Sequence, residues 1–211
     1  MEAFDYLRDP AAIYRQSFAT IEAEADFAGL DADALALATR MIHACGMVDI
    51  VKDIEMSRGA VAQGRRALGD GAVIFCDVEM VRHGIIRRNL PKSNDVICTL
   101  DQPRLQEHAE AHETTRSAAA VDFWDHRLAG SVVVIGNAPT ALFRLLERIA
   151  GGGPKPALII GVPVGFVGAI ESKQALATQS FDVSFITLHG RRGGSALAAA
   201  ALNAVAVGLA T

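Results

Sequence analysis

Short apolar runs alternate with longer helical patterns along nearly the whole chain, and this alternation limits the fold more than any other feature. Six runs have the length and composition of strands: residues 49–54, 72–76, 95–99, 131–135, 157–161 and 183–188. The fourth and fifth show no polar alternation, which is typical of strands covered on both faces. Strict alternation predicts an α/β fold, a mainly parallel open sheet with helices on both faces. The length of 211 residues predicts a single domain, residues 1–211.

Four of the connecting helices have readable ends. Asp9-Pro10 is an N-cap followed by proline at the first helical position, and it predicts a helix from residue 10. A second helix is expected to begin near residue 31 or 33 and to run to residue 45, where Gly46 ends it. Pro103 predicts the start of a long polar helix through residue 120, and Asn137-Ala-Pro139 predicts another through residue 149.

Composition excludes several classes of protein. A formal net charge of −4 argues against a nucleic-acid-binding protein. The chain opens MEAFDYLRDP without a basic and then apolar signal sequence. The apolar stretch 195–210 is mostly Ala and carries Asn203, so we expect a buried helix and no membrane contact. The three cysteines lie far apart, which excludes the usual zinc and redox spacings and favours free thiols in the cytoplasm.

Three of the predicted strands end in glycine-containing loops: residues 136–140, 161–168 and 190–195. In open parallel sheets, ligands bind beyond the carboxyl ends of the strands, and exposed N–H groups at helix starts favour anions. Any α/β protein needs glycine in such turns, but three together, with Arg191 and Arg192 in the last, favour an anionic ligand. Neither a G-x-G-x-x-G nor a P-loop motif is present, so a polycarboxylate is favoured over a nucleotide.

His43, Arg40 and Ser17 are candidate site residues in the first two helices. Arg40 precedes His43 by three residues, so the two side chains share a helix face. A lone histidine on an apolar helix is more often structural than functional. Ser17 interrupts an apolar stripe, and such a serine usually bonds back to the backbone one turn earlier.

The remaining polar groups are also considered from their positions in the sequence. His108 and His112 are four residues apart among glutamates, which is typical of a solvated helix face and does not match H-E-x-x-H. Arg116 lies nearer the apolar end of that helix and could point into a cleft. Asp77 and Glu79 follow a strand, where acids commonly cap a turn. Asp49, Asp53 and Glu55 alternate along another predicted strand and are expected to share one exposed face.

The chain resembles the precorrin-8X methylmutase family, which includes enzymes acting on cobalt-precorrin-8, at segments that span nearly its whole length in one order. No resemblance is found in residues 100–112. The matching segments are Arg40-Met-Ile-His-Ala44, Cys76-Asp-Val-Glu-Met-Val81 with Gly84-Ile85, Thr115-Arg-Ser-Ala-Ala119, Val134-Ile-Gly-Asn-Ala-Pro-Thr-Ala-Leu142, Pro163-Val-Gly-Phe-Val-Gly-Ala169 with Glu171-Ser-Lys173, and Gly190-Arg-Arg-Gly-Gly-Ser195 with Asn203-Ala204.

The resemblance implies an isomerase that moves a methyl group from C11 to C12 of precorrin-8X to give hydrogenobyrinic acid. It implies a homodimer with active sites near the subunit interface and a tetrapyrrole polycarboxylate as substrate, and it calls for no cofactor and no metal. By position, His43 matches the acid–base residue, and Ser17, Arg40 and Arg116 match substrate-binding residues. Two alternatives stay open: the equivalent reaction on cobalt-precorrin-8, and a tetrapyrrole carrier without turnover.

The methyl shift is a reaction that a single acid–base residue such as His43 can assist. A methyl shift changes no formula and needs no redox equivalents. Protonating the macrocycle makes its π-system more electron-poor, and the proton must then return. One histidine, with an unperturbed pKa of about 6.5, can serve both steps near neutral pH, and general acid–base help of this kind is typically worth about 10²–10⁴-fold.

Overall fold

The computed structural model describes residues 4–124 and 126–207. Its centre is a six-stranded sheet with the order β1-β6-β5-β4-β2-β3, in which neighbours are parallel except for β1, which runs antiparallel to β6 at one edge. The mainly parallel sheet is therefore confirmed. The strands are β1 (Ile54–Met56), β2 (Ile74–Cys76), β3 (Val96–Cys98), β4 (Val132–Ile135), β5 (Leu158–Gly161) and β6 (Ser184–Leu188).

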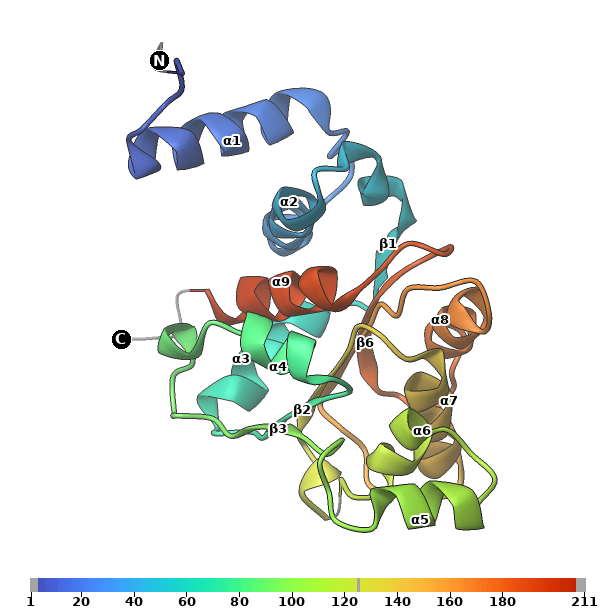
Figure 1. Ribbon diagram of the computed structural model, residues 1–211. Coiled ribbons are helices and arrows are strands. Elements are labelled where there is room, and N and C mark those ends of the chain that lie inside the picture. Colours follow the sequence, from blue (N-terminus) through green and yellow to red (C-terminus); the bar gives the residue numbers. More distant parts are fainter. Residues whose placement is uncertain (1–3, 125, 208–211) are drawn as a thin grey trace.

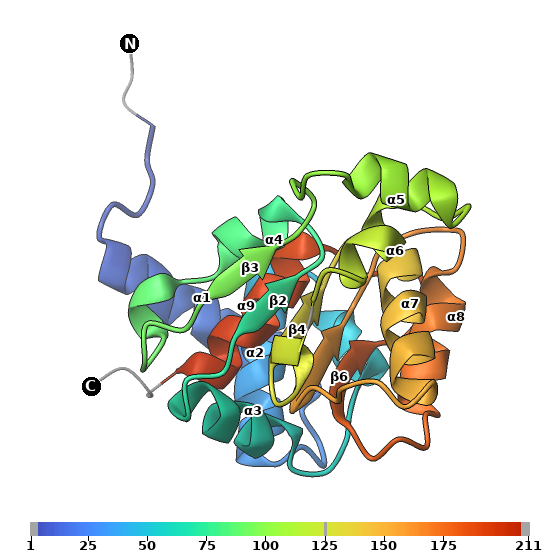
Figure 2. The same cartoon turned by 90° about the horizontal axis from the view of Figure 1, so that it is seen from below.

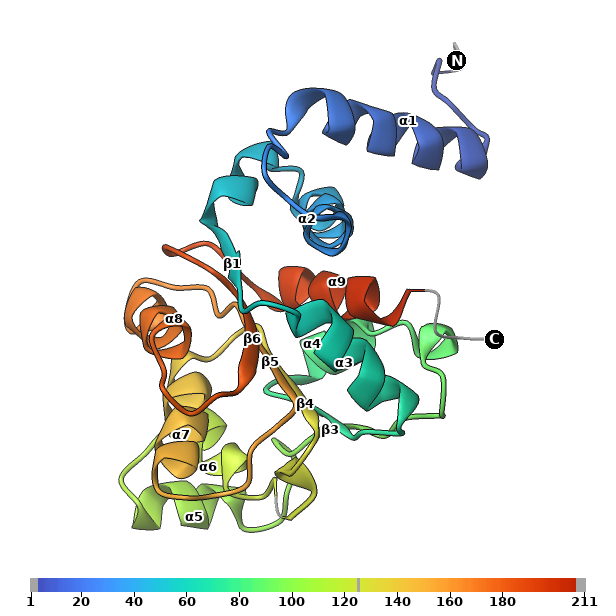
Figure 3. The ribbon, with the colours of Figure 1, turned by 180° about the vertical axis from the view of Figure 1, so that it is seen from behind.

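Helices cover both faces of the sheet, as expected (Figures 1 and 3). One face carries α3, α4 and α9, with α2 packed outside α9, and the opposite face carries α6, α7 and α8. The helices are α1 (Pro10–Glu24), α2 (Ala32–Cys45), α3 (Ala60–Gly69), α4 (Glu79–Gly84), α5 (Leu105–Ala111), α6 (Arg116–Val121), α7 (Pro139–Ala150), α8 (Ala169–Ala177) and α9 (Ser195–Ala206); short 3₁₀ turns are η1 (Val48–Asp53), η2 (Arg87–Asn89) and η3 (His126–Leu128).

The side chains of the central strands point alternately into two apolar cores, one on each face of the sheet. All four residues of β4 are buried. Because successive side chains of a strand point to opposite faces, Val132 and Val134 enter the core beneath α9, whereas Val133 and Ile135 enter the core beneath α7. A strand that must fill two apolar cores has no polar alternation, as its sequence indicated.

The predicted ends of the first two helices are confirmed. Asp9 accepts hydrogen bonds from the N–H groups of Ala11 and Ala12 at the start of α1. Asp31 caps α2 by accepting from Ala34, and Gly46 ends that helix with a left-handed φ of 70°. Such a φ is easily adopted by glycine, so the helix ends at Cys45, two residues after His43.

The predicted strand 49–54 is wrong, because most of it forms the turn η1 and β1 begins only at Ile54. Asp49 and Asp53 do not share an extended face with Glu55. Both instead accept hydrogen bonds from Arg192, at 2.7 and 2.5 Å. A helical turn brings two aspartates four residues apart onto one guanidinium, which an extended strand would not do.

The predicted long helix from 103 to 120 is also wrong. Two short helices, α5 and α6, replace it, and they are separated by a turn in which Glu113 has a φ of 47°. Thr115 then caps α6 by accepting a hydrogen bond from Ala118. The turn folds the polar α5 back against α6 (Figure 2).

The apolar C-terminal stretch forms the buried helix α9, as expected up to Ala206; residues 208–210 of that prediction lie outside the described residues. Across the ranges that the structure describes, no helix is long and apolar enough to cross a bilayer. In contrast to α9, the helix α1 is mostly exposed. Its one buried residue is Ile21, it packs on α2, and it lies at the periphery of the molecule (Figures 1 and 2).

Candidate functional site

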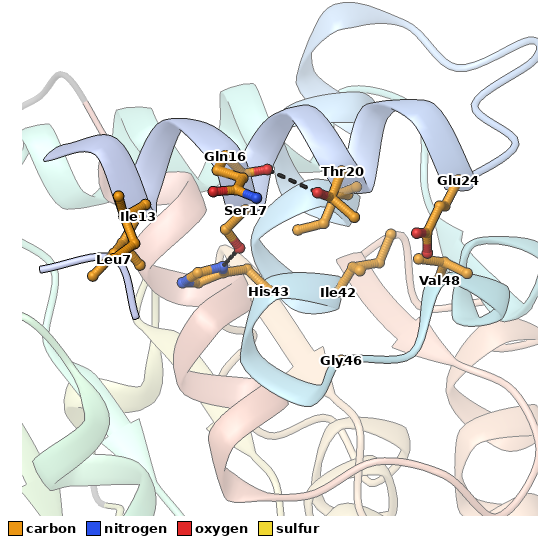
Figure 4. Close-up of a pocket in the computed structure, with 11 residues that line it drawn as sticks. Leu7, Ile13, Gln16, Ser17, Thr20, Glu24, Ile42, His43, Gly46 and Val48 are labelled. Carbon is orange, nitrogen blue, oxygen red and sulfur yellow. Dashed lines mark hydrogen bonds between the residues drawn. The ribbon is translucent and has the colours of Figure 1, made fainter. Parts of the chain in front are cut away.

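A cavity of about 460 Å³ lies between α1 and α2 and contains His43 (Figure 4). Its volume falls in the range of small-molecule sites, about 300–1,000 Å³. Both apolar and polar side chains line it, and the imidazole of His43 forms part of its wall. The cavity is lined by Leu7, Ile13, Gln16, Ser17, Thr20, Ile21, Glu24, Ile42, His43, Gly46 and Val48.

Ser17 is hydrogen-bonded to His43. The distance from Ser17 Oγ to His43 Nδ1 is 2.9 Å, and the bond joins two helices through residues 26 positions apart. The usual interpretation of Ser17, a bond back to its own helix, is therefore wrong. The Nε2 side of the imidazole faces the end of the cavity where Leu7 and Ile13 lie (Figure 4).

Two aromatic residues of α1 pack against the same imidazole. The ring of Phe18 is stacked on His43 with centroids 5.2 Å apart, and the ring of Tyr14 is tilted against it at 5.5 Å. The two aromatic rings also contact each other, at 4.6 Å. Neither residue was predicted from the sequence. Their spacing of four, on the helix face that carries Ser17, was the signal that could have identified them.

Arg40 lies one turn before His43 on α2, as its spacing predicted. Its Nη1 donates a hydrogen bond to the hydroxyl oxygen of Tyr14 at 3.4 Å. Arg40 is half-buried, whereas His43 is exposed. The structure therefore brings together three of the four predicted site residues, Ser17, Arg40 and His43, at the junction of α1 and α2.

Arg116, the fourth predicted site residue, lies elsewhere. It begins α6, on the opposite face of the sheet from α2, and its Nη2 donates to the backbone carbonyl of Leu100 at 3.2 Å. It is exposed and is not among the residues that line the cavity beside His43. Within one chain, Arg116 and His43 do not share a site.

Three polar residues in the cavity were not predicted. Gln16, Thr20 and Glu24 follow one another at intervals of four along α1, and all three line the cavity. Glu24 lies near Val48 at the end away from Leu7 (Figure 4). The cavity therefore has an apolar end near the Nε2 of His43 and an anionic end at Glu24.

The first glycine loop, after β4, does not offer the free N–H groups that the sequence suggested. The N–H groups of Gly136, Asn137 and Ala138 donate to the carboxylate of Asp77 at 3.0, 2.8 and 2.8 Å. The other two loops bond to each other: Gly194 donates to Val162, and Gly165 donates to Arg191. The predicted anion site after β4 is therefore occupied by Asp77, whereas the two later loops are held against each other.

Asp77 acts as the turn cap that its position favoured, but it caps the turn after β4 and not the one that follows it in sequence. Only 3% of it is exposed, and burial raises the pKa of its carboxyl while the three backbone N–H groups lower it. Glu79, two residues later, pairs with Arg82 at 2.9 Å. Neither acid lies in the cavity beside His43.

The two arginines after β6 are also engaged. Arg192 binds Asp49 and Asp53, and this hydrogen bond from Arg192 lowers the pKa of Asp49. The guanidinium of Arg191 lies over the ring of Phe166 at 5.4 Å. Lys173 is fully buried and donates to the carbonyl of Arg192 at 2.7 Å. Burial lowers the pKa of Lys173 to about 8.

His108 is not the solvated residue that was expected. It is half-buried, its Nε2 lies 2.9 Å from an Asp122 oxygen, and its ring packs on Phe123. His112 is exposed, as expected. Among the residues that the structure describes, no group of three or more His, Cys, Asp and Glu side chains is arranged to hold a metal ion.

Comparison with known proteins identifies the family. The family model for precorrin-8X methylmutase matches residues 12–207. The precorrin-8X methylmutase of Pseudomonas aeruginosa is 59% identical over 96% of this chain and 97% of its own length. The cobalt-precorrin-8 methylmutase of Methanothermobacter thermautotrophicus is 36% identical over 85% of this chain and 83% of its own. A crystal structure of the precorrin-8X methylmutase from Thermus thermophilus superposes with a TM-score of 0.84 at 37% identity, covering 95% of this chain and 98% of that one. The chain belongs to the precorrin-8X methylmutase family.

Proposed function

We propose that residues 1–211 form one methylmutase domain that moves the methyl group of precorrin-8X from C11 to C12, giving hydrogenobyrinic acid, with His43 as its acid–base residue. The observation that carries this proposal is the position of His43, in the wall of a cavity and hydrogen-bonded through Nδ1 to Ser17, in a chain of the methylmutase family. The reaction is an isomerisation, so the single proton given to the macrocycle is the one taken back.

Ser17 suits a histidine that must change its protonation state twice. A serine hydroxyl is both a donor and an acceptor. Its oxygen can accept from Nδ1–H both in the imidazolium and in the neutral imidazole that keeps its proton on Nδ1, so the hydrogen bond persists in both states. With Nδ1 protonated throughout, Nε2 is free to give up a proton and take one back. Nε2, which faces Leu7 and Ile13, is the atom we assign to proton exchange with the macrocycle.

Arg40 is the group that we assign to a carboxylate arm of the substrate. Guanidinium and carboxylate groups form strong, often bidentate pairs. Arg40 is one helical turn from His43, so a ring held by one arm at Arg40 lies close to the imidazole. Glu24 at the far end of the cavity disfavours a second carboxylate there, which would give the ring one preferred orientation.

The metal-free substrate is favoured over cobalt-precorrin-8 because the relative named for precorrin-8X is 59% identical, against 36% for the one named for the cobalt compound. We expect a higher kcat/KM for precorrin-8X than for cobalt-precorrin-8 in direct competition. The reverse ratio would make the cobalt compound the substrate. We also expect a cytoplasmic location, which three free cysteines favour.

An absorption spectrum recorded during incubation with a large excess of precorrin-8X distinguishes an enzyme from a tetrapyrrole carrier without turnover. We expect the spectrum to change to that of hydrogenobyrinic acid at many substrates per protein. A change that stops at one equivalent would make the chain a tetrapyrrole carrier and would contradict the proposal.

We further propose that the active form is a homodimer in which Arg116 of one copy contributes to the His43 site of the other. Arg116 and His43 lie on opposite faces of the sheet in one chain, so a shared substrate requires a second copy. Large apolar side chains are also exposed: Phe4 by 88%, Phe166 by 86% and Val167 by 89%. Phe166 and Val167 are neighbours in the chain, and a contiguous exposed apolar patch commonly marks a protein interface.

Mixed dimers test this arrangement. His43→Ala and Arg116→Ala chains are each expected to lose activity, and co-refolding them is expected to restore some, because each mixed dimer then has one intact site. If the two residues acted within one chain, every site in the mixture would lack one of them. An inactive mixture that light scattering shows to be dimeric would therefore contradict the proposal.

A further inference from the structure

The pair of helices α1 and α2 carries one residue that contacts both Arg40 and His43. Tyr14 lies on α1, three residues before Ser17, and is about half exposed. Its hydroxyl oxygen accepts a hydrogen bond from Nη1 of Arg40, and its ring lies against the ring of His43 with centroids 5.5 Å apart. Because Tyr14 is not part of the buried core, burial does not explain its position.

We infer that Tyr14 is a positioning residue for the methyl shift, with its hydroxyl orienting Arg40 and its ring supporting the imidazole of His43. The inference rests on the proposed function, because it assigns Arg40 to a substrate carboxylate. It adds a residue that touches neither the migrating methyl group nor the proton.

The hydroxyl acts on Arg40 because a guanidinium on a long, flexible stem must lose rotamer freedom to bind a carboxylate. Across the ranges that the structure describes, the Tyr14 oxygen is the one side-chain hydrogen-bond partner of Arg40. It leaves the other guanidinium nitrogens available. A carboxylate arm would then meet a cation that is already oriented, which strengthens binding of substrate and transition state alike.

The ring acts on His43 together with Phe18. Tyr14 and Phe18 contact each other at 4.6 Å and both contact the imidazole, so they restrict the ring from one side while Ser17 fixes Nδ1. The two parts of Tyr14 therefore affect different kinetic constants. Loss of the hydroxyl is expected to affect binding, and loss of the ring is expected to affect the chemical step.

Tyr14→Phe removes the hydroxyl and keeps the ring. We expect KM for precorrin-8X to rise about 2- to 10-fold, the value of one modest hydrogen bond, with kcat and its pH profile unchanged. Tyr14→Leu removes both parts, and we expect kcat to fall as well. Tyr6→Phe is the matched control, because it deletes the other phenol hydroxyl of the chain, on a residue whose ring lies beneath Arg8.

A double-mutant cycle with Arg40→Gln tests whether the hydroxyl acts through the guanidinium. In the Arg40→Gln background, Tyr14→Phe is expected to change KM no further. If the two effects on KM multiply, or if Tyr14→Phe lowers kcat and leaves KM unchanged, the inference is wrong. Circular dichroism and Tm of each variant separate these results from misfolding.

The same cycle distinguishes a failure of the role assigned to Tyr14 from a failure of the proposed methylmutase function. If Arg40→Gln raises KM and Tyr14→Phe does not, only the inference is overturned. If the wild-type chain converts no more than one equivalent of precorrin-8X, the proposed function fails and the inference fails with it.

Discussion

Replacing Asp77 should destabilise the protein more than replacing any exposed acid. Asp77 is almost fully buried and its two carboxylate oxygens accept three backbone N–H bonds from the turn between β4 and α7. Asp77→Ala leaves these N–H groups without their acceptor. A buried polar group that loses its partner costs about 1–3 kcal/mol.

The expected loss is smaller than three such groups would give in full, because burying the carboxylate is itself unfavourable, as its raised pKa indicates. Removing one side of a buried charged interaction typically costs about 3–5 kcal/mol. For a chain of this length, each kcal/mol lowers Tm by about 2–4 °C. We therefore expect the Tm of Asp77→Ala to fall by roughly 6–20 °C.

Asp77→Asn is a graded test. Its amide oxygen can still accept from Asn137 and Ala138, but its NH₂ group then faces the N–H of Gly136, so one bond is lost. We expect a loss of about 1–3 kcal/mol. The control is Asp101→Ala, which removes an exposed carboxylate and is expected to change stability by about 0.5 kcal/mol or less.

The assay is urea unfolding of the three variants and the wild type, followed by circular dichroism, with thermal unfolding beside it. The order of stability should be wild type and Asp101→Ala, then Asp77→Asn, then Asp77→Ala. An Asp77→Ala variant as stable as Asp101→Ala would refute the reasoning, since the three hydrogen bonds would then contribute nothing net.

Two further predictions concern the loop after β6 and Lys173 of α8, which donates a hydrogen bond to that loop. A Cβ on Gly193 would lie 2.2 Å from the carbonyl oxygen of Val162, so Gly193→Ala should lower the free energy of unfolding in urea by about 1–3 kcal/mol. The control Gly69→Ala has open space at its Cβ and should not lower it. Equal stability of the two variants would contradict the steric argument. Lys173 has its pKa lowered by burial from 10.5 to about 8, so between these values the unfolded chain binds more protons than the folded one and the contribution of Lys173 to stability rises with pH. The unfolding free energy of wild type minus that of Lys173→Met should therefore rise by about 3 kcal/mol from pH 8 to 10.5, and a flat difference would mean that Lys173 titrates normally.

The parts of the fold that were predicted correctly are those fixed by local sequence. Strands such as β4 and β5 are apolar at every position because they fill two cores. The caps at Asp9 and Asp31 and the stop at Gly46 depend on residues within one turn of the helix end. The order of the strands was not predictable, because it depends on which apolar faces pair over long distances in the sequence.

Two of the errors share a physical cause, which is that partners far along the chain decided local structure. Asp49 and Asp53 form a turn because Arg192, about 140 positions later, binds both. The N–H groups after β4 do not bind a ligand because Asp77 reaches them from a neighbouring strand. Neither partner is visible in the segment itself.

The candidate site was predicted in part. Spacing placed Arg40 and His43 on one face of a helix, and the resemblance to the family added Ser17. The contact of Ser17 with His43 depends on how α1 packs on α2, which sequence reasoning did not address. Tyr14 and Phe18 were missed for the same reason, although their spacing on α1 matches that face.

The central claim is that the imidazole of His43 carries the proton of the reaction. The most direct measurement is the turnover of precorrin-8X by His43→Ala, with and without added free imidazole, in protein whose fold is verified by circular dichroism. We expect turnover to fall by about 10²–10⁴-fold and to recover in part as imidazole fills the vacated space beside Ser17. Near-normal turnover by the folded variant without imidazole would contradict the account.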